Sequence, residues 1–203
     1  GNDAGAVTED AATVTATGTL QISDVDAGES KFEAATHSGN YGSLQIADTG
    51  VWTYTLNNSA VQSLGAGDTV DDVITVSSVD GTASEDITIT IKGTNDVPEI
   101  TGSHTAFIAE DTASIGGQVT VVDPDSGESQ ALQQTYISTT YGSFSVSDTG
   151  AWTYNLNNAE DMVQTLSVGE QLSDTVTVTS ADGTATHNIS VTITGTNDAA
   201  EIT

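Results

Sequence analysis

The acidic residues of this chain gather in short clusters, and each cluster occurs twice. An Asp-x-Asp-x-Gly-Glu segment at residues 24–29 returns at residues 123–128. An early Glu-Asp pair and a late Asn-Asp pair also recur in both halves. The pairs are Glu9-Asp10 and Glu110-Asp111, and Asn95-Asp96 and Asn197-Asp198. All of these side chains offer oxygen atoms, which are the ligands that calcium takes in sets of about six to eight.

The Asp-x-Asp loop is the centre of this interpretation. Alternate aspartates on an extended loop direct their oxygens toward one point, and Gly28 or Gly127 permits the turn between them. An EF-hand is excluded, because that motif needs its glycine at position six and a glutamate at position twelve, whereas Gly28 is fifth and Glu29 sixth. The loop alone is equally compatible with a solvated turn. Its coincidence with the two pairs in both halves favours a Ca²⁺ site.

Net charge restricts the partners. The 203 residues include 29 Asp and Glu against 2 Lys and Arg, a formal net charge of −27. Nucleic acids and anionic membranes need a basic surface, so neither is an expected partner. Salt bridges cannot neutralise so many carboxylates, and only solvent ions or bound metal can. Disulfides are excluded because the chain has no cysteine, and no apolar run is long enough to span a membrane.

The elements that position these clusters are themselves repeated at domain size. Asp48-Thr49-Gly50-Val51-Trp52-Thr53-Tyr54 returns 100 residues later as Asp148-Thr149-Gly150-Ala151-Trp152-Thr153-Tyr154. Tyr-Gly-Ser, Asp-Gly-Thr-Ala and Gly-Thr-Asn-Asp segments also recur in the same order. A tandem copy of about 100 residues predicts two domains that fold separately, at residues 1–98 and 99–203.

Each copy predicts an antiparallel β-sandwich. Residues 87–91 alternate Ile with Thr after the Asp80-Gly81 turn, and residues 189–193 alternate Ile or Val with Ser or Thr after Asp182-Gly183. This alternation around an Asp-Gly pair is typical of a β-hairpin with one buried face. Residues 57–64 and 157–166 lack alternation and predict a short helical turn. About seven strands per copy indicate an all-β protein with two tandem Ig-like or cadherin-like sandwiches.

In order, these motifs resemble VCBS repeats, which are cadherin-like modules of very large bacterial surface and secreted proteins, including RTX-type adhesins. The resemblance covers nearly the whole chain twice. It implies a calcium-stabilised extender module without enzymatic activity, located outside the cell or on the bacterial surface. Neighbouring repeats of the same polypeptide are the implied partners. Contacts with glycans or cell surfaces are expected through other regions of the parent protein, and the chain itself is expected to be a monomer that does not insert into membranes.

The resemblance also implies ligand sets. One set, at the central junction, combines the first linker with the start, the loop and the late turn of the second copy: Asn95, Asp96, Glu110, Asp111, Asp123, Asp125, Glu128 and Asp182. The equivalent set at the N-terminal end is Asn2, Asp3, Glu9, Asp24, Asp26, Glu29 and Asp80. Asn197 and Asp198 would serve a following module. Calcium would cancel the repulsion among these carboxylates and stiffen the linker.

A carbohydrate- or cell-binding module is the alternative function, with Tyr41, Tyr141 or an exposed Trp52 as a sugar platform. Burial of Trp52 and Trp152 in the core is the simpler interpretation. An enzyme is not expected, because the paired carboxylates lie in loops that are repeated in both copies. The three histidines, His37, His104 and His187, do not match between the copies and are predicted to be surface residues.

Overall fold

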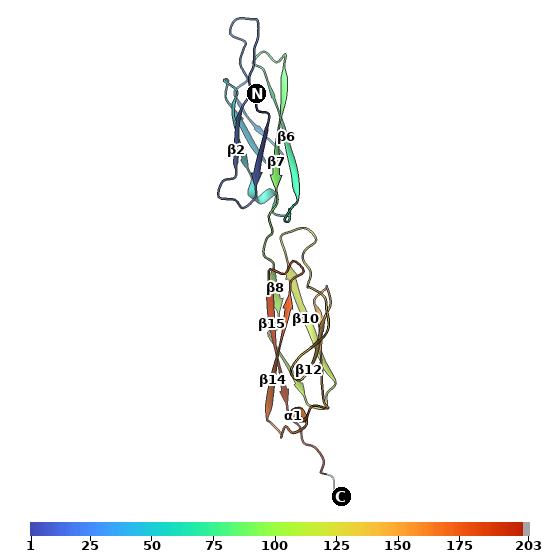
Figure 1. The fold of residues 1–203 in the computed structure, drawn as a ribbon. Helices are drawn as coiled ribbons and strands as arrows, with labels where there is room; N and C mark the ends of the chain where they lie inside the picture. Colours follow the sequence, from blue (N-terminus) through green and yellow to red (C-terminus); the bar gives the residue numbers. More distant parts are fainter. Residues whose placement is uncertain (201–203) are drawn as a thin grey trace. The chain divides into compact units, whose positions relative to one another are not determined.

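The computed structural model describes residues 1–200 and divides the chain into two compact units, Gly1–Asp96 and Val97–Thr203. Each unit has its own buried apolar cluster, and the two are described separately below. Strands account for nearly all of the regular structure (Figure 1). The predicted all-β class and the tandem arrangement of two sandwich domains are confirmed.

Unit 1 is a sandwich of two sheets. Its strands are β1 (Ala4–Thr8), β2 (Thr15–Thr19), β3 (Ala35–Ser38), β4 (Gly42–Ile46), β5 (Val51–Leu56), β6 (Thr69–Ser77) and β7 (Ser84–Lys92). One sheet has the order β1-β7-β6 and the other β2-β5-β4-β3. Neighbouring strands are antiparallel except β1 and β7, which are parallel with Ala6 opposite Thr90. This parallel pair means that β1 and β7 end on the same side of the unit.

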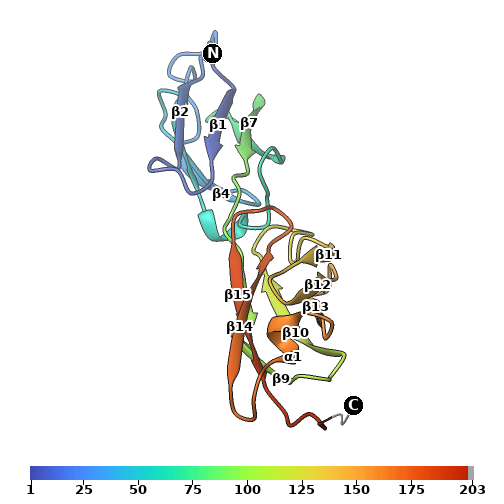
Figure 2. The ribbon, with the colours of Figure 1, turned by 60° about the horizontal axis from the view of Figure 1, so that its bottom comes forward.

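Unit 2 repeats this plan with one additional strand at its start. Its strands are β8 (Glu99–Gly102), β9 (Thr105–Ala109), β10 (Ser114–Val122), β11 (Gln134–Ser138), β12 (Gly142–Val146), β13 (Ala151–Leu156), β14 (Gln171–Thr179) and β15 (Thr186–Thr194). Within residues 97–200 the two sheets have the orders β14-β15-β9 and β11-β12-β13-β10-β8. Figure 2 shows β14 and β15 in one layer and β10 to β13 in the other. β9 is the first strand of the three-stranded sheet along the chain, and it is parallel to the last, β15, as β1 is to β7 in unit 1.

The core lies between the sheets and is built from the inward positions of alternating strands. Trp52 is fully buried and Trp152 is 4 % exposed, so the core interpretation of the tryptophans is confirmed. A sugar platform on Trp52 is therefore excluded. Gly18 faces the Trp52 ring so closely that an added Cβ would lie 2.4 Å from a ring carbon. Gly117 has the same relation to Trp152 at 2.6 Å, so both copies need glycine there.

The predicted local elements are also present. β6 and β7 form the expected antiparallel hairpin, and Gly81 and Gly183 in the Asp-Gly turns have φ angles of 74° and 79°. Positive φ is the conformation that glycine adopts without steric cost, which explains the residue type. The predicted helical turns are a 3-10 turn at Asn58–Ala60 and a short helix, α1, at Asp161–Gln164.

A buried carboxylate that the sequence did not reveal ties the two sheets of each unit together. In unit 1, Asp72 on β6 accepts hydrogen bonds from the Asn40 N–H (2.8 Å), the Tyr41 N–H (3.0 Å) and the Tyr54 hydroxyl (2.8 Å). Burial first, and then the hydrogen bond to this carboxylate, raise the pKa of Tyr54, so its hydroxyl remains a donor. Asp174 has the same role in unit 2, where it accepts from Tyr141 and Tyr154.

Candidate calcium sites

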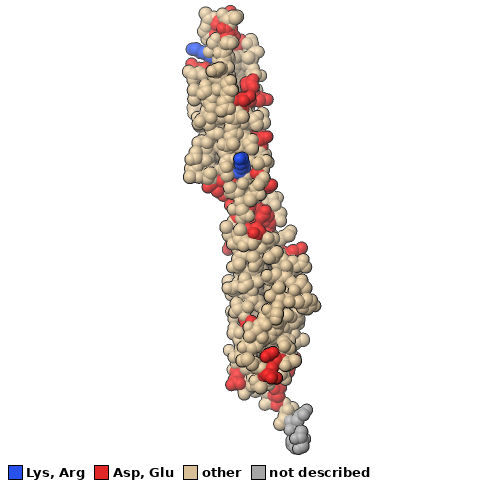
Figure 3. Space-filling model, in the orientation of Figure 1, with Lys and Arg blue, Asp and Glu red and all other residues tan. Residues whose placement is uncertain are grey.

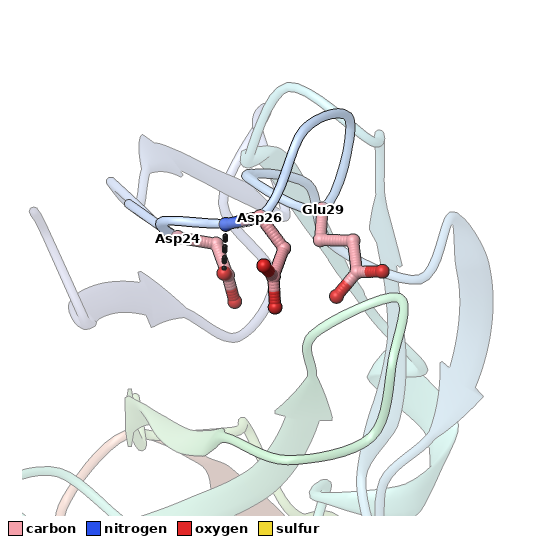
Figure 4. A group of neighbouring side chains, drawn as sticks. All are labelled: Asp24, Asp26 and Glu29. Carbon is pink, nitrogen blue, oxygen red and sulfur yellow. Dashed lines mark hydrogen bonds between the residues drawn. The ribbon is translucent and has the colours of Figure 1, made fainter.

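The Asp-x-Asp loop of unit 1 brings three carboxylates together. Asp24, Asp26 and Glu29 each offer an oxygen, and the three oxygens lie within 4.8 Å of one another. Figure 4 shows the three side chains pointing to the same side of the loop. The loop is shaped locally: the Asp26 N–H donates to Asp24 Oδ1 (2.8 Å), the Asp24 N–H donates to Ser30 Oγ (2.8 Å), and Gly28 has a φ of 94°. The carboxylate oxygens of this loop therefore do converge, as the spacing in the sequence predicts.

Unit 2 forms a related cluster with a different third member. Here Asp123 and Glu128 from the loop are joined by Asp182 from the β14–β15 turn, again with oxygens within 4.8 Å. The loop hydrogen bonds repeat, with the Asp125 N–H donating to Asp123 Oδ1 (2.9 Å) and the Asp123 N–H to Ser129 Oγ (3.0 Å). Asp123 is 8 % exposed and Asp125 only 1 %. Late turn and loop therefore act together in this copy.

The equivalent turn residue of unit 1, Asp80, is held by its own turn. Its carboxylate accepts hydrogen bonds from Ser78 Oγ and Thr82 Oγ1, both at 2.6 Å. These two bonds lower the pKa of Asp80, with the Ser78 bond contributing most. Asp80 lies outside the group of three that the loop forms. Since Val79 donates to the Lys31 carbonyl (3.0 Å), the turn still lies beside the loop at the same end of unit 1.

The charge balance at these clusters fits a bound cation. Unit 2 contains no Lys or Arg at all, and the ion pair described in unit 1, Lys31 with Asp48 at 3.9 Å, joins two exposed side chains. In unit 2, Asp123 Oδ2 is buried and accepts no hydrogen bond from the described residues. A buried carboxylate oxygen without a partner is costly unless a cation satisfies it. The donor set is all oxygen, which suits calcium.

The early glutamates lie elsewhere. Glu9 is fully buried and its Oε1 accepts a hydrogen bond from the Thr94 N–H (2.7 Å) at the end of unit 1 where β1 and β7 finish. Glu110 is 2 % exposed and accepts in the same way from the Thr196 N–H, after β15. Its second oxygen, Oε2, is buried and accepts no hydrogen bond from the described residues. Each glutamate therefore binds, through a hydrogen bond, the segment that follows the last strand of its own unit.

The predicted grouping of Glu110 and Asp111 with the loop residue Asp123 is therefore wrong. Glu110 follows β9 and precedes β10, whereas Asp123 follows β10, so a nine-residue strand separates them. At about 3.3 Å per residue that strand is roughly 27 Å long. Glu9 is likewise separated from the Asp24 loop by the length of β7. Glu9 lies beside the end of β7, whereas the Asp80 turn, which lies next to the loop, is at the beginning of β7. We call the two ends of each unit the aspartate end and the glutamate end.

The glutamate end also holds the second member of each early pair. Asp10 and Asp111 are non-glycine residues with φ angles of 52° and 64°. Their N–H groups donate to the side chains of Asn58 (2.9 Å) and Asn158 (3.1 Å). The hydrogen bond from the Asn58 amide, followed by one from Gln62, lowers the pKa of Asp10. The asparagines were missed, although the repeated Leu-Asn-Asn at residues 56–58 and 156–158 was a usable signal.

The remaining predicted ligands lie on the segments before and after the sheets. The Asn2 carbonyl accepts from Trp52 Nε1 (2.8 Å), and the Asp3 carbonyl accepts from the Thr88 N–H (2.9 Å). The Asn95 and Asn197 side chains donate to the carbonyls of the residues that follow them, Asp96 (2.6 Å) and Asp198 (3.1 Å). A ligand role for these residues stays a prediction.

The histidines of unit 2 are not both surface residues. His187 is 4 % exposed and stacks on His104, with ring centroids 4.2 Å apart. In unit 1 the same positions are Asp3 and Glu85, as the hydrogen bonds of Thr88 to Asp3 and of Ser190 to His104 show. The metal-type clusters of residues 1–200 contain carboxylates only.

With the fold and the clusters in view, comparison with known proteins defines the class. Residues 1–93 and 95–195 each match the family described as bacterial cadherin-like domain. The chain therefore belongs to the bacterial cadherin-like domain family, in two copies.

Solved structures agree on the fold. The chain is similar to the protocadherin gammaB7 EC3-6 cis-dimer structure, with a TM-score of 0.55 and 18 % identity over 97 % of this chain and 47 % of that one. It is also similar to mouse clustered PcdhgC3 EC1-3, with a TM-score of 0.51 and 16 % identity over 97 % of this chain and 66 % of that one. The chain thus spans between about half and two thirds of these structures. No protein with a curated description matches the sequence.

A helix of the length and apolar character that would cross a membrane does not occur among residues 1–200.

Proposed function

We propose that the chain is a pair of calcium-stabilised extender modules of a larger extracellular bacterial protein. The observation that carries this proposal is the convergence of three carboxylates to within 4.8 Å at the aspartate end of both units. Membership of a non-enzymatic domain family and the absence of positive side chains from unit 2 support it. The order of the repeated motifs further supports modules of the VCBS type, in a surface adhesin whose other regions bind the target.

In unit 1, Asp24, Asp26 and Glu29 would hold the ion, and in unit 2, Asp123, Glu128 and Asp182. Bound calcium supplies positive charge that offsets the mutual repulsion of these oxygens. The chain prepares each site by bonding the second aspartate's N–H to the first aspartate's side chain, which fixes the loop before an ion arrives. The burial of Asp123 makes the unit 2 site the one with the most to gain from an ion.

The glutamate end supports a second part of the proposal, a reduced freedom of the linker. The Thr94 N–H donates to Glu9 Oε1, so Glu9 and the adjacent Asp10 place two carboxylates beside the segment that leaves unit 1, which itself carries Asp96. We propose that calcium restrains this segment and with it the motion of one unit against the other. Small-angle scattering before and after chelation tests this, with chelation expected to broaden the range of distances between the units.

Calcium binding itself is tested by calorimetric titration of the full chain. We expect heat from at least one ion per unit, and a loss of the unit 2 component in Asp123→Asn. Asp148→Asn is the matched control, because Asp148 is an exposed aspartate in the turn between β12 and β13 of the same unit. Extracellular modules bind calcium at roughly 0.1 to 1 mM. No heat over that range, or an equal loss in both variants, contradicts the proposal.

A further inference from the structure

The outer face of the sheet β14-β15-β9 in unit 2 carries no charged side chain. Every second residue of these strands points away from the core, as their burial patterns show. The thirteen outward positions are Gln171, Ser173, Thr175, Thr177 and Thr179 on β14, Thr186, Asn188, Ser190, Thr192 and Thr194 on β15, and Thr105, Phe107 and Ala109 on β9. A neutral face of this extent is unexpected in a chain with a net charge of −27.

The same face of unit 1 provides an internal comparison. There the sheet β6-β7-β1 presents two carboxylates and an ammonium group, on Asp71, Asp86 and Lys92. By register the equivalent residues of unit 2 are Ser173, Asn188 and Thr194. Neutral hydrogen-bonding groups therefore stand in unit 2 at all three positions that are charged in unit 1. In Figure 3 the red carboxylates of unit 2 gather toward its ends and the stretch between them is largely tan.

An aromatic ring stands on the edge strand of this neutral face, β9. Phe107 is 67 % exposed and occupies the position of Ala6 in unit 1. Phe107 lies opposite Thr192, which in turn lies opposite Ser173. The ring and these two hydroxyl groups therefore form a row across the sheet. One exposed apolar residue needs no explanation by itself. Here it coincides with the absence of charged side chains from the outward positions of the whole sheet.

We propose that this face binds an uncharged polysaccharide, with a sugar ring stacked on Phe107. Aromatic rings supply a flat apolar surface for the C–H face of a sugar, and the surrounding hydroxyl and amide groups can exchange hydrogen bonds with sugar hydroxyls. Ser173 Oγ and Ser190 Oγ lie 3.2 Å apart, and Thr177 Oγ1 donates to Asn188 Oδ1 at 2.8 Å, so neighbouring polar groups are already ordered by one another.

Charge and composition decide the class of ligand. An anionic polysaccharide would meet the field of a strongly acidic chain without any lysine or arginine in unit 2 to pair with it. A protein partner would need a larger apolar centre, because protein interfaces depend on clusters of buried aromatic and aliphatic side chains. A neutral glycan needs neither. The face shares no residue with the calcium clusters, so this inference stands apart from the proposed calcium function.

Affinity electrophoresis of the full chain in millimolar calcium tests the proposal. The gels contain hydroxyethylcellulose, laminarin or dextran as neutral polysaccharides and alginate as an anionic one. We expect retardation by at least one neutral polymer and none by alginate. Phe107→Ala is expected to weaken this binding by roughly tenfold or more, since a stacked aromatic contributes about that factor. The double variant Ser173→Asp/Asn188→Asp, which restores the carboxylates of unit 1, is expected to do the same.

These variants are designed to fold, because each introduces the residue that the other copy holds at the same position. Tyr136→Ala is the matched control, since Tyr136 on β11 of the other sheet is 76 % exposed. The proposal is overturned if no neutral polymer retards the chain, or if Tyr136→Ala weakens binding as much as Phe107→Ala. It is also overturned if sedimentation shows that Phe107 mediates self-association of the chain and no glycan binds.

Discussion

Removal of the buried carboxylate Asp72 is expected to be among the most damaging single changes in unit 1. Its side chain is fully buried and accepts three hydrogen bonds, from the Asn40 N–H, the Tyr41 N–H and the Tyr54 hydroxyl. These bonds fasten the β3–β4 loop and strand β5 of one sheet to β6 of the other. Truncation to alanine leaves three donors without their acceptor and opens a polar gap between the sheets.

The size of the effect follows from the bonds lost. A hydrogen bond to a charged group contributes about 1.5–3 kcal/mol, and a buried donor left without a partner costs about 1–3 kcal/mol. Because the loop can partly recover hydrogen bonds with water, we expect Asp72→Ala to lower the free energy of unfolding of unit 1 by about 3–5 kcal/mol. Tyr54→Phe removes only one bond and is expected to cost about 1.5–3 kcal/mol.

Urea unfolding followed by hydrogen exchange, peptide by peptide, measures each unit of the full chain separately. For a urea dependence of about 1 kcal/mol per molar, Asp72→Ala lowers the midpoint of unit 1 by about 3–5 M and leaves unit 2 unchanged. Asp71→Ala is the matched control, because Asp71 is the preceding residue on β6 but points outward. Its expected cost is within about 0.5 kcal/mol. Equal midpoints for Asp71→Ala and Asp72→Ala refute the reasoning.

Three further predictions concern titration and backbone geometry. Burial opposes the ionised form of Asp174, but the hydrogen bonds that it accepts, among them those from the Tyr141 N–H, the Tyr154 hydroxyl and the Thr175 N–H, prevail and lower its pKa. The contribution of Asp174 to the stability of unit 2 is therefore present above about pH 4 and is lost as the pH falls through the folded pKa. Asp174→Asn should make the urea midpoint of unit 2 less dependent on pH in that acid range. Asn58→Ala removes the hydrogen bond that contributes most to the lowered pKa of Asp10. An NMR titration should therefore show the pKa of Asp10 closer to its ordinary value in this variant and unchanged in Asn57→Ala. Gly50 has a φ of 84°, and a Cβ added there would lie 2.4 Å from the Leu20 carbonyl oxygen. At Gly81 φ is 74°, but an added Cβ would meet no atom within 4 Å, so Gly81→Ala should cost about 1 kcal/mol and Gly50→Ala more. Equal shifts of the thermal unfolding midpoint in the two variants contradict this.

Much of the fold could be predicted because its elements are local. The hairpin from β6 to β7 follows from the alternation of Ile with Thr around Asp80-Gly81, and the 3-10 turn follows from the loss of alternation after Leu56. The parallel pairs β1-β7 and β9-β15 could not be predicted, since they join residues more than 80 positions apart. No local pattern distinguishes a strand that pairs with a distant parallel strand from one that pairs with its neighbour.

That unpredicted pairing also explains the error in the candidate sites. The oxygens of the Asp-x-Asp loop converge within six residues, so the sequence was sufficient for Asp24, Asp26 and Glu29. The position of Glu9 depends on β1 running parallel to β7, which carries Glu9 to Thr94 and away from the loop. Acidic residues that could all bind a metal are thus placed by the topology at two different ends of the unit. Only a long-range strand pairing determines the end at which each one lies.

Comparison of the two copies separates what the framework needs from what a unit adds. The copies agree on the buried Asp72 and Asp174, on the glutamates that clasp the departing segment, and on the acidic loop. They differ at outward positions of one sheet, where Ala6, Asp71 and Asp86 become Phe107, Ser173 and Asn188. Substitutions on an exposed face cost the fold little, so such a face can change while the ends remain constrained by their carboxylates. A face that lacks every charge of its counterpart and carries one exposed ring is therefore better explained by a ligand than by stability.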